Sequence, residues 1–129
     1  MKQPATLTIA ALVVIVLTTL HLTHDALHNP DEMTAKGVTI LLLIELVMLY
    51  GTVVLAGRRL GYLIMLLGGL AAASMPYLHT MGPRATRWGF LFVWTLFGLG
   101  VGGLFTAVLA ARALWRSLRA PSSVDGAQS

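Results

Sequence analysis

Residues 4–22 of this 129-residue chain read PATLTIAALVVIVLTTLHL, a run without a single charged side chain. Three further apolar runs follow, at about residues 37–56, 60–78 and 88–114. Each run reaches the roughly 20 residues that an α-helix needs to cross a hydrocarbon layer about 30 Å thick. Because lipid offers backbone groups no hydrogen-bond partner, the runs predict helices. The sequence therefore predicts an all-α polytopic membrane protein, a bundle of four transmembrane helices.

The composition agrees with a membrane protein and excludes several functional classes. Hydrophobic residues make up 57% of the chain and charged residues 11%, against about a quarter charged in soluble domains. The chain has no cysteine, which excludes disulfides, thiolate metal sites and thiol catalysis. The arginines flank the apolar runs, which excludes nucleic acid as a partner. The sequence contains no Walker loop, dinucleotide fingerprint, GxSxG or HExxH motif, so it favours a non-enzymatic protein.

The four runs predict one transmembrane domain, residues 1–119, with helices at approximately 4–24, 36–56, 60–79 and 87–115. The first run exceeds the ~7–15 apolar residues of a signal peptide and no small-x-small cleavage site follows it. We therefore expect it to be a retained helix. The small and polar residues 120–129 predict a disordered cytoplasmic tail.

Basic residues are distributed unevenly between the two ends of the predicted bundle. One end carries six of them: Lys2, Arg58, Arg59, Arg112, Arg116 and Arg119. The other end carries three: Lys36, Arg84 and Arg87. By the positive-inside rule this distribution predicts that both termini are cytoplasmic, N-in and C-in. We also expect Arg112, Arg116 and Arg119, at the end of the last helix, to contact anionic lipid of the bilayer.

All four histidines lie at the predicted outer boundary, which makes this boundary the main functional signal. His21, His24 and His28 recur at helical spacing, with Asp25 one turn after His21, so the four side chains share one face. His79 ends the third run at the same depth. Imidazoles and a carboxylate in this arrangement are candidate ligands for copper or zinc, or for haem b. The alternative is that these residues only cap helix ends and meet lipid headgroups.

Glu45 is an acidic residue inside an apolar run, LLLIELVM at residues 41–48. An intramembrane carboxylate costs roughly 2.5–3.5 kcal/mol on insertion scales, so we expect it to face the bundle or a cavity. Counting residues from the outer boundary places four hydroxyl side chains near its level: Thr18, Thr19, Ser74 and Thr95. Glu45 is therefore a candidate for carrying a proton or binding a ligand, unless it only joins helices through a hydrogen bond.

Small residues on the last two helices predict close helix contacts, among them Gly98-x-x-x-Gly102 and the pair Gly68-Gly69. Such surfaces serve either packing within the chain or the interface of a homo-oligomer. We favour packing within the chain, because four helices need inner surfaces first.

Three stretches carry a resemblance to other proteins: LTTLHL at residues 17–22, Gly61-Tyr62 with Gly68-Gly69, and FVWTL at residues 92–96. They resemble a group of small uncharacterised bacterial membrane proteins, a likeness that implies four helices in a bacterial inner membrane and no particular function. The chain is also similar to small multidrug-resistance exporters in size, helix number and a single membrane carboxylate, although theirs lies in the first helix. Its histidines on a four-helix bundle resemble those of di-haem b-type cytochromes, which lie at two depths rather than one.

Together these features predict a non-enzymatic integral membrane accessory or small-ligand-binding protein with an outward-facing His/Asp cluster. We expect it to work as a homo-oligomer or within a larger membrane complex. One alternative is metal or b-type haem binding at the cluster. A second alternative is proton-coupled export of a small molecule through Glu45.

Overall fold

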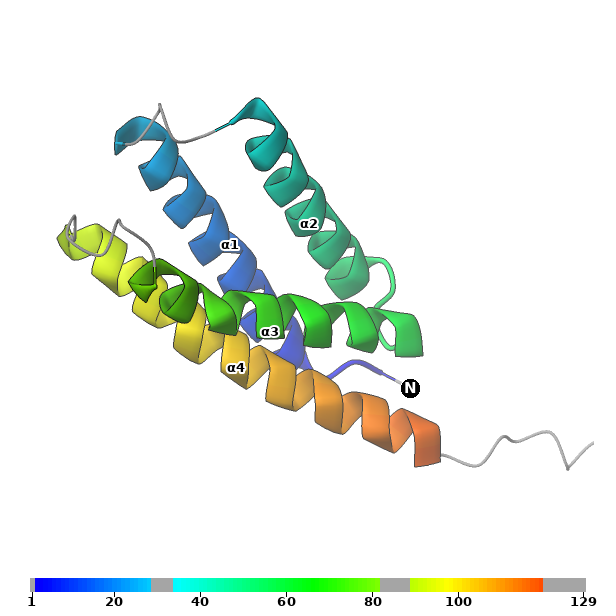
Figure 1. Ribbon diagram of the computed structural model, residues 1–129. Helices are drawn as coiled ribbons and strands as arrows, with labels where there is room; N and C mark the ends of the chain where they lie inside the picture. The colour runs from blue at the N-terminus through cyan, green and yellow to red at the C-terminus, as the bar shows by residue number, and fades with distance from the viewer. Residues whose placement is uncertain (1, 29–33, 82–88, 120–129) are drawn as a thin grey trace, which may run out of the picture.

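A computed structural model describes residues 2–28, 34–81 and 89–119 of the chain. This part of the chain forms four helices: α1 (Ala5–His28), α2 (Ala35–Val53), α3 (Arg59–Thr80) and α4 (Phe90–Arg119) (Figure 1). Each helix is long and apolar enough to cross a membrane. The prediction of an all-α chain with four such helices is therefore confirmed. The predicted tail at residues 120–129, together with Arg84 and Arg87, lies outside the described residues.

The helices begin and end at residues that differ slightly from the predicted ones. α1 continues to His28 rather than residue 24, and α4 continues to Arg119 rather than residue 115. Both extensions are largely polar. Hydropathy shows where a chain leaves the hydrocarbon, and a helix can continue beyond that point. α2 ends at Val53, before the predicted residue 56, and a short turn leads into α3. That turn contains Gly57, whose φ of 78° suits glycine far better than residues with a Cβ.

α3 and α4 make the closest helix contact, and glycines make it possible. A Cβ added to Gly103 would lie 2.6 Å from both the backbone nitrogen of Ala73 and the backbone oxygen of Gly69. α1 packs on another side of α4, where Cβ atoms on Gly98 and Gly102 would meet Leu17 and Val14 of α1. The predicted small-residue surfaces thus form contacts between helices of the same chain.

α2 is the peripheral helix of the bundle. Among the described helices it packs against α1 and α3 but not against α4 (Figure 1). Its buried residues are confined to the half near α3: Met48, Gly51 and Thr52. The other half carries large apolar side chains on the outside, such as Leu43, which is 55% exposed. α2 therefore lacks a single inward face, as expected for a helix surrounded mainly by lipid.

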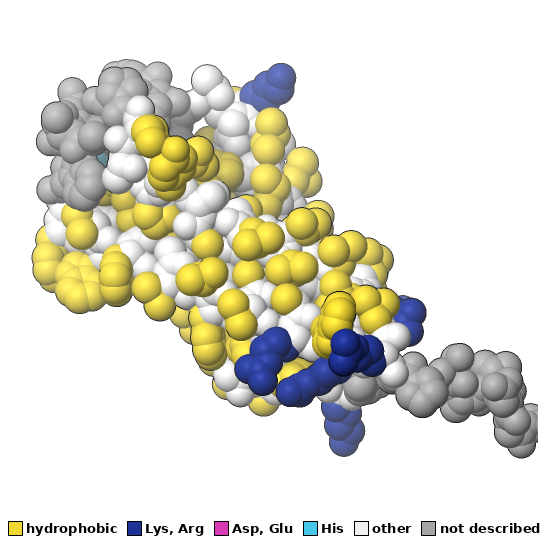
Figure 2. All heavy atoms as spheres, turned by 60° about the horizontal axis from the view of Figure 1, so that its bottom comes forward, with side chains coloured by type: hydrophobic (Ala, Val, Ile, Leu, Met, Phe, Trp, Pro, Cys, Tyr) yellow, Lys and Arg dark blue, Asp and Glu magenta, His cyan; other side chains and the backbone are white. Residues whose placement is uncertain are grey.

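The two ends of the bundle differ in chemistry. We call the end that holds the start of α1, the α2–α3 turn and the end of α4 the arginine end. Figure 2 shows Lys and Arg side chains gathered there on an otherwise largely apolar surface. The side chain of Gln3 links segments of this end by two hydrogen bonds: it donates to Thr52 O at 3.2 Å and accepts from Gly57 N at 3.2 Å. The opposite end, where α1 and α3 finish, is the histidine end.

Candidate metal centre

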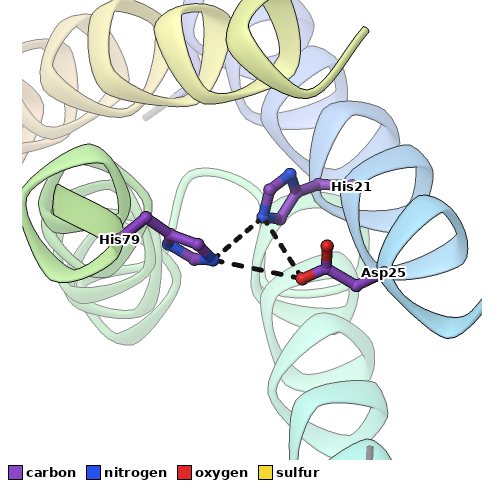
Figure 3. A group of neighbouring side chains, drawn as sticks. All are labelled: His21, Asp25 and His79. Atoms are coloured by element: carbon purple, nitrogen blue, oxygen red, sulfur yellow. Dashed lines mark hydrogen bonds and ion pairs between the residues drawn. The ribbon is translucent and has the colours of Figure 1, made fainter. Parts of the chain in front are cut away.

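Three potential ligand atoms converge at the histidine end: Nε2 of His21 and Oδ2 of Asp25 from α1, and Nε2 of His79 from α3 (Figure 3). The Nε2 atoms lie 3.4 Å apart, and the Asp25 oxygen lies 3.7 Å from His21 and 4.0 Å from His79. A point equidistant from the three atoms lies about 2.1 Å from each, within the ~2.0–2.2 Å range of zinc–nitrogen and zinc–oxygen bonds. The three atoms therefore already stand at coordination spacing.

Local helix geometry and one aromatic ring place these side chains. His21 and Asp25 are one turn apart on α1, so both point from the same face. His79 lies in the last turn of α3. Phe92 of α4 is buried beneath the two imidazoles, with its ring centroid 5.1 Å from that of His21 and 5.5 Å from that of His79. α4 thus supplies the platform on which α1 and α3 meet.

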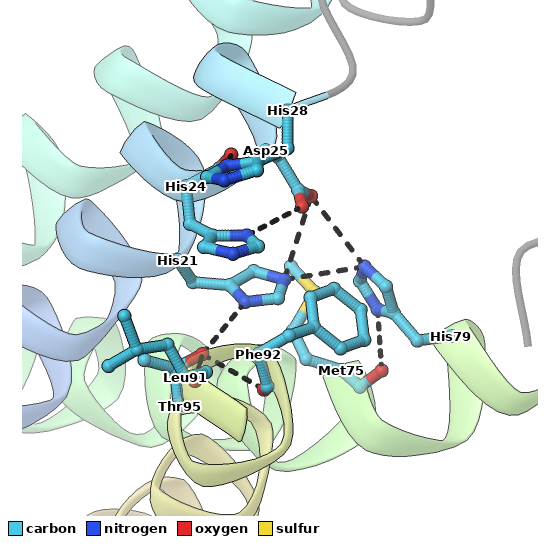
Figure 4. Close-up of polar contacts among 9 residues, drawn as sticks. All are labelled: His21, His24, Asp25, His28, Met75, His79, Leu91, Phe92 and Thr95. Atoms are coloured by element: carbon cyan, nitrogen blue, oxygen red, sulfur yellow. Dashed lines mark hydrogen bonds and ion pairs between the residues drawn. The ribbon is translucent and has the colours of Figure 1, made fainter. Parts of the chain in front are cut away.

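The other ring nitrogen of each histidine is held by a hydrogen bond (Figure 4). His79 Nδ1 lies 2.9 Å from the backbone oxygen of Met75, which can only accept, so Nδ1 carries the proton. His21 Nδ1 lies 3.2 Å from Thr95 Oγ1. The Thr95 hydroxyl donates to the carbonyls of Leu91 and Phe92 at 3.0 Å, so its oxygen accepts from His21 Nδ1.

These hydrogen bonds leave both Nε2 atoms with a free lone pair. Two lone pairs and a carboxylate oxygen, at most 4.0 Å apart, repel one another unless a cation lies among them. A proton or a metal ion can fill this role. Orientation of ligating histidines by a carbonyl or hydroxyl at the second nitrogen is also the usual arrangement in metal sites.

Burial leaves the group reachable from one side. His21 is 6% exposed, whereas the side chains of Asp25 and His79 are 16% and 17% exposed. Three protein ligands with limited access to the surface leave one position for water or another ligand, as in open zinc sites.

The remaining predicted histidines lie further out. His24 and His28 stack on each other, with ring centroids 4.2 Å apart, and His28 Nδ1 bonds the backbone oxygen of His24 at 2.9 Å. His24 Nδ1 lies 4.0 Å from Asp25 Oδ1, at the limit of an ion pair. Of the five predicted ligands, His21, Asp25 and His79 therefore form the compact group. His24 borders it, and the exposed His28 lies outside it.

Glu45 lies apart from this group, in the wall of a cavity of about 70 Å³ between α1, α2 and α3. Its Oε1 lies 3.2 Å from the Thr19 hydroxyl, and Thr18 also lines the cavity. The other two hydroxyls predicted at this level have different partners. Ser74 donates to the backbone oxygen of Ala71, and Thr95 binds His21.

The predicted basic residues at the end of α4 are exposed at the arginine end: Arg112, Arg116 and Arg119. The Arg119 guanidinium lies over the ring of Trp115, 4.3 Å from its centroid. These residues take no part in the histidine group, which lies at the opposite end of the helices.

Two contributors to the candidate centre were not predicted from the sequence. Thr95 was placed near Glu45 by counting residues, and nothing in the sequence pointed to Phe92. Comparison of the chain with protein-family models, with curated proteins and with solved structures finds no match. The chemistry of this protein must therefore be argued from its own geometry.

Proposed function

We propose that this chain is a non-enzymatic integral membrane protein that binds one divalent metal ion of the zinc class through His21, Asp25 and His79. The observation that carries the proposal is the spacing of the three ligand atoms, 3.4–4.0 Å, with both Nδ1 atoms already engaged. Two imidazoles and one carboxylate form a ligand set that zinc accepts with a fourth position open.

The same geometry favours a single ion over the other cofactors considered. A haem between His21 and His79 would need its porphyrin to pass between two Nε2 atoms only 3.4 Å apart, beside the Asp25 carboxylate. Copper(I) favours soft sulfur ligands, whereas the three converging ligand atoms are two nitrogens and one oxygen. The nitrogen and oxygen donors match zinc, and copper(II) would bind the same set by its generally higher affinity.

We further propose that the protein crosses a bacterial inner membrane with both termini in the cytoplasm. The six basic residues of the arginine end support this orientation by the positive-inside rule: Lys2, Arg58, Arg59, Arg112, Arg116 and Arg119. The metal site then faces outward, where it would take an ion from outside the cell.

Metal binding can be tested on the purified protein in mild detergent, after treatment with a chelator. Titration with Zn²⁺ against a chromophoric chelator should give one ion per chain, and Co²⁺ should give the visible absorption of a four-coordinate centre. Asp25→Asn and His79→Ala should each weaken zinc binding by more than the roughly 10- to 100-fold cost of losing a second-shell partner.

His28→Ala is the matched control, because His28 lies on the same helix face but outside the compact group. It should bind zinc like the unaltered protein. Equal losses in His28→Ala and His79→Ala, or no zinc binding by a protein that retains its helical circular dichroism, would contradict the proposal.

A further inference from the structure

The cavity beside Glu45 lies directly inward of the metal site. On α1, Val14 and Thr18 line the cavity, and the same helix face continues outward to His21. On α3, Met75 lines the cavity, and His79 follows it one turn further out. Residues three, four or seven apart share a helix face, so the site and the cavity lie one behind the other along the same two helices. We call this cavity the inner chamber.

Glu45 is the only titratable side chain among the described residues that line the inner chamber. The Thr19 hydroxyl faces it from α1 at 3.2 Å, and the Thr18 hydroxyl donates to the backbone oxygen of Val14 at 2.9 Å. On the α3 side, apolar and thioether side chains line the chamber, and His79 follows them one turn further toward the histidine end. A carboxylate in such a setting is neutralised by a bound proton or by a cation, because neither lipid nor apolar walls solvate its charge.

Size and wall chemistry decide which cation fits. The cavity has a volume of about 70 Å³, roughly half that of a ~150 Å³ apolar cavity able to hold benzene, and it is partly open, so its walls cover only a few carbon atoms of a guest. A metal ion would exchange most of its oxygen ligands for hydrocarbon, since hard cations need six or more oxygens. The flexible thioethers of Met48 and Met75 can instead adapt to an apolar guest.

We propose that the inner chamber binds a small alkylammonium ion, with the ammonium group on the Glu45 carboxylate and the short carbon chain against the apolar walls. This site is separate from the proposed metal centre and does not depend on it.

The test is a calorimetric titration of the detergent-purified protein with propylammonium. Glu45→Gln keeps the shape of the side chain and removes its charge, and should weaken binding by about 10- to 100-fold, as expected for a lost hydrogen bond to a charged group. Lys36→Gln removes a charge from the outer end of the same helix and should leave the affinity unchanged.

A second variant tests the chamber itself rather than its charge. Ala71 lines the chamber, so Ala71→Leu should fill it and abolish binding although Glu45 is retained. Ala111→Leu makes the same change at an exposed position of α4 and should have no effect. In the unaltered protein, affinity should rise about fourfold per added methylene from methyl- to propylammonium, and methylenes that extend beyond the walls of the chamber should add less.

The two proposed sites can fail independently. His79→Ala should lose zinc and keep propylammonium, whereas Glu45→Gln should do the reverse, and the retained ligand shows that each variant is folded. No binding of propylammonium by the unaltered protein would overturn the assignment of the inner chamber. Unchanged binding in Glu45→Gln or in Ala71→Leu would overturn it equally.

Discussion

Thr95 determines which nitrogen of His21 is free to bind a metal ion. Its hydroxyl accepts from His21 Nδ1 at 3.2 Å and is itself held by two carbonyls of α4. We expect Thr95→Val, which keeps the shape and removes the acceptor, to weaken zinc binding by about 10- to 100-fold. Thr95→Ser should retain the affinity. The dissociation constants from chelator competition check this, and equal affinities for Val and Ser would refute a role in positioning His21.

Protons compete with the metal ion for the two Nε2 atoms. Each histidine must be neutral to ligate, so zinc affinity should fall as the pH is lowered toward about 5, by up to about tenfold per pH unit and per histidine where imidazoles take up protons. The affinity falls toward low pH because these histidines can take up protons only when the metal ion is absent. Zinc titrations across this range provide the measurement, with His28→Ala expected to follow the same curve. A pH-independent affinity would exclude His21 and His79 as ligands.

The compact group was predictable from the sequence only in part. The spacing of His21 and Asp25 places them together on any helix, and counting residues brings His79 to their level. Counting gives the depth of a residue but not the direction in which its side chain points. In the structure Thr95 therefore contacts His21 rather than Glu45, because α1 packs against α4 on that side. Only the arrangement of the helices in space could supply that direction.

At the scale of the helices, the contact between α3 and α4 depends on Gly103. Alanine in a helix is normally favoured over glycine by about 1 kcal/mol. At this position its Cβ would lie 2.6 Å from the backbone of α3, which cannot move like a flexible side chain. We expect the steric clash to outweigh the helix propensity of alanine, so that Gly103→Ala lowers the free energy of unfolding by about 1–3 kcal/mol.

Unfolding of the detergent-solubilised protein by added sodium dodecyl sulfate, followed by circular dichroism, measures this effect. Gly89→Ala is the control, because no atom of the described residues lies within 4 Å of the Cβ that it would add. A stabilised Gly103→Ala would show that α3 and α4 do not approach as closely as described.

Hydropathy predicted the existence and order of the four helices well but their packing poorly. A helix in lipid can be apolar all round, so α2 carries no stripe that identifies its neighbours. α3 packs closely on α4 through small-residue contacts such as Gly69 with Gly103, whereas α2 lies at the periphery and packs only on α1 and α3. The sequence shows which residues are small, but not which of them meet.

For the whole molecule, orientation in the membrane is the prediction that matters most for the metal site. The chain has no cysteine, so single cysteines can report on it without background. Ala35 begins α2 and Ala56 lies in the turn that follows it, and both are exposed, at opposite ends of the bundle. A membrane-impermeant maleimide should label Ala35→Cys in cells with a permeabilised outer membrane, and Ala56→Cys only after the inner membrane is opened. The reverse pattern would contradict cytoplasmic termini.

Other predictions at this scale concern partners and relatives. Assembly into a homo-oligomer or a larger membrane complex stays a prediction, and so does the likeness to small bacterial membrane proteins. Contact with anionic lipid also stays a prediction for Arg112, Arg116 and Arg119. Copurification from native membranes would identify a complex. The surface of α2 facing away from α1 and α3 carries large exposed apolar side chains, so it is the natural place to look for one.

The division of the metal centre among three helices has a consequence for biosynthesis. Ligands come from α1 and α3, while α4 contributes the platform and the hydrogen bond that orients His21. A chain inserted from its N-terminus therefore carries two ligands early and a complete site only after its last helix has arrived. If the proposed site binds an ion, full affinity would distinguish a finished molecule from a nascent one, and the ion, by linking α1 to α3, would help to retain the assembled bundle.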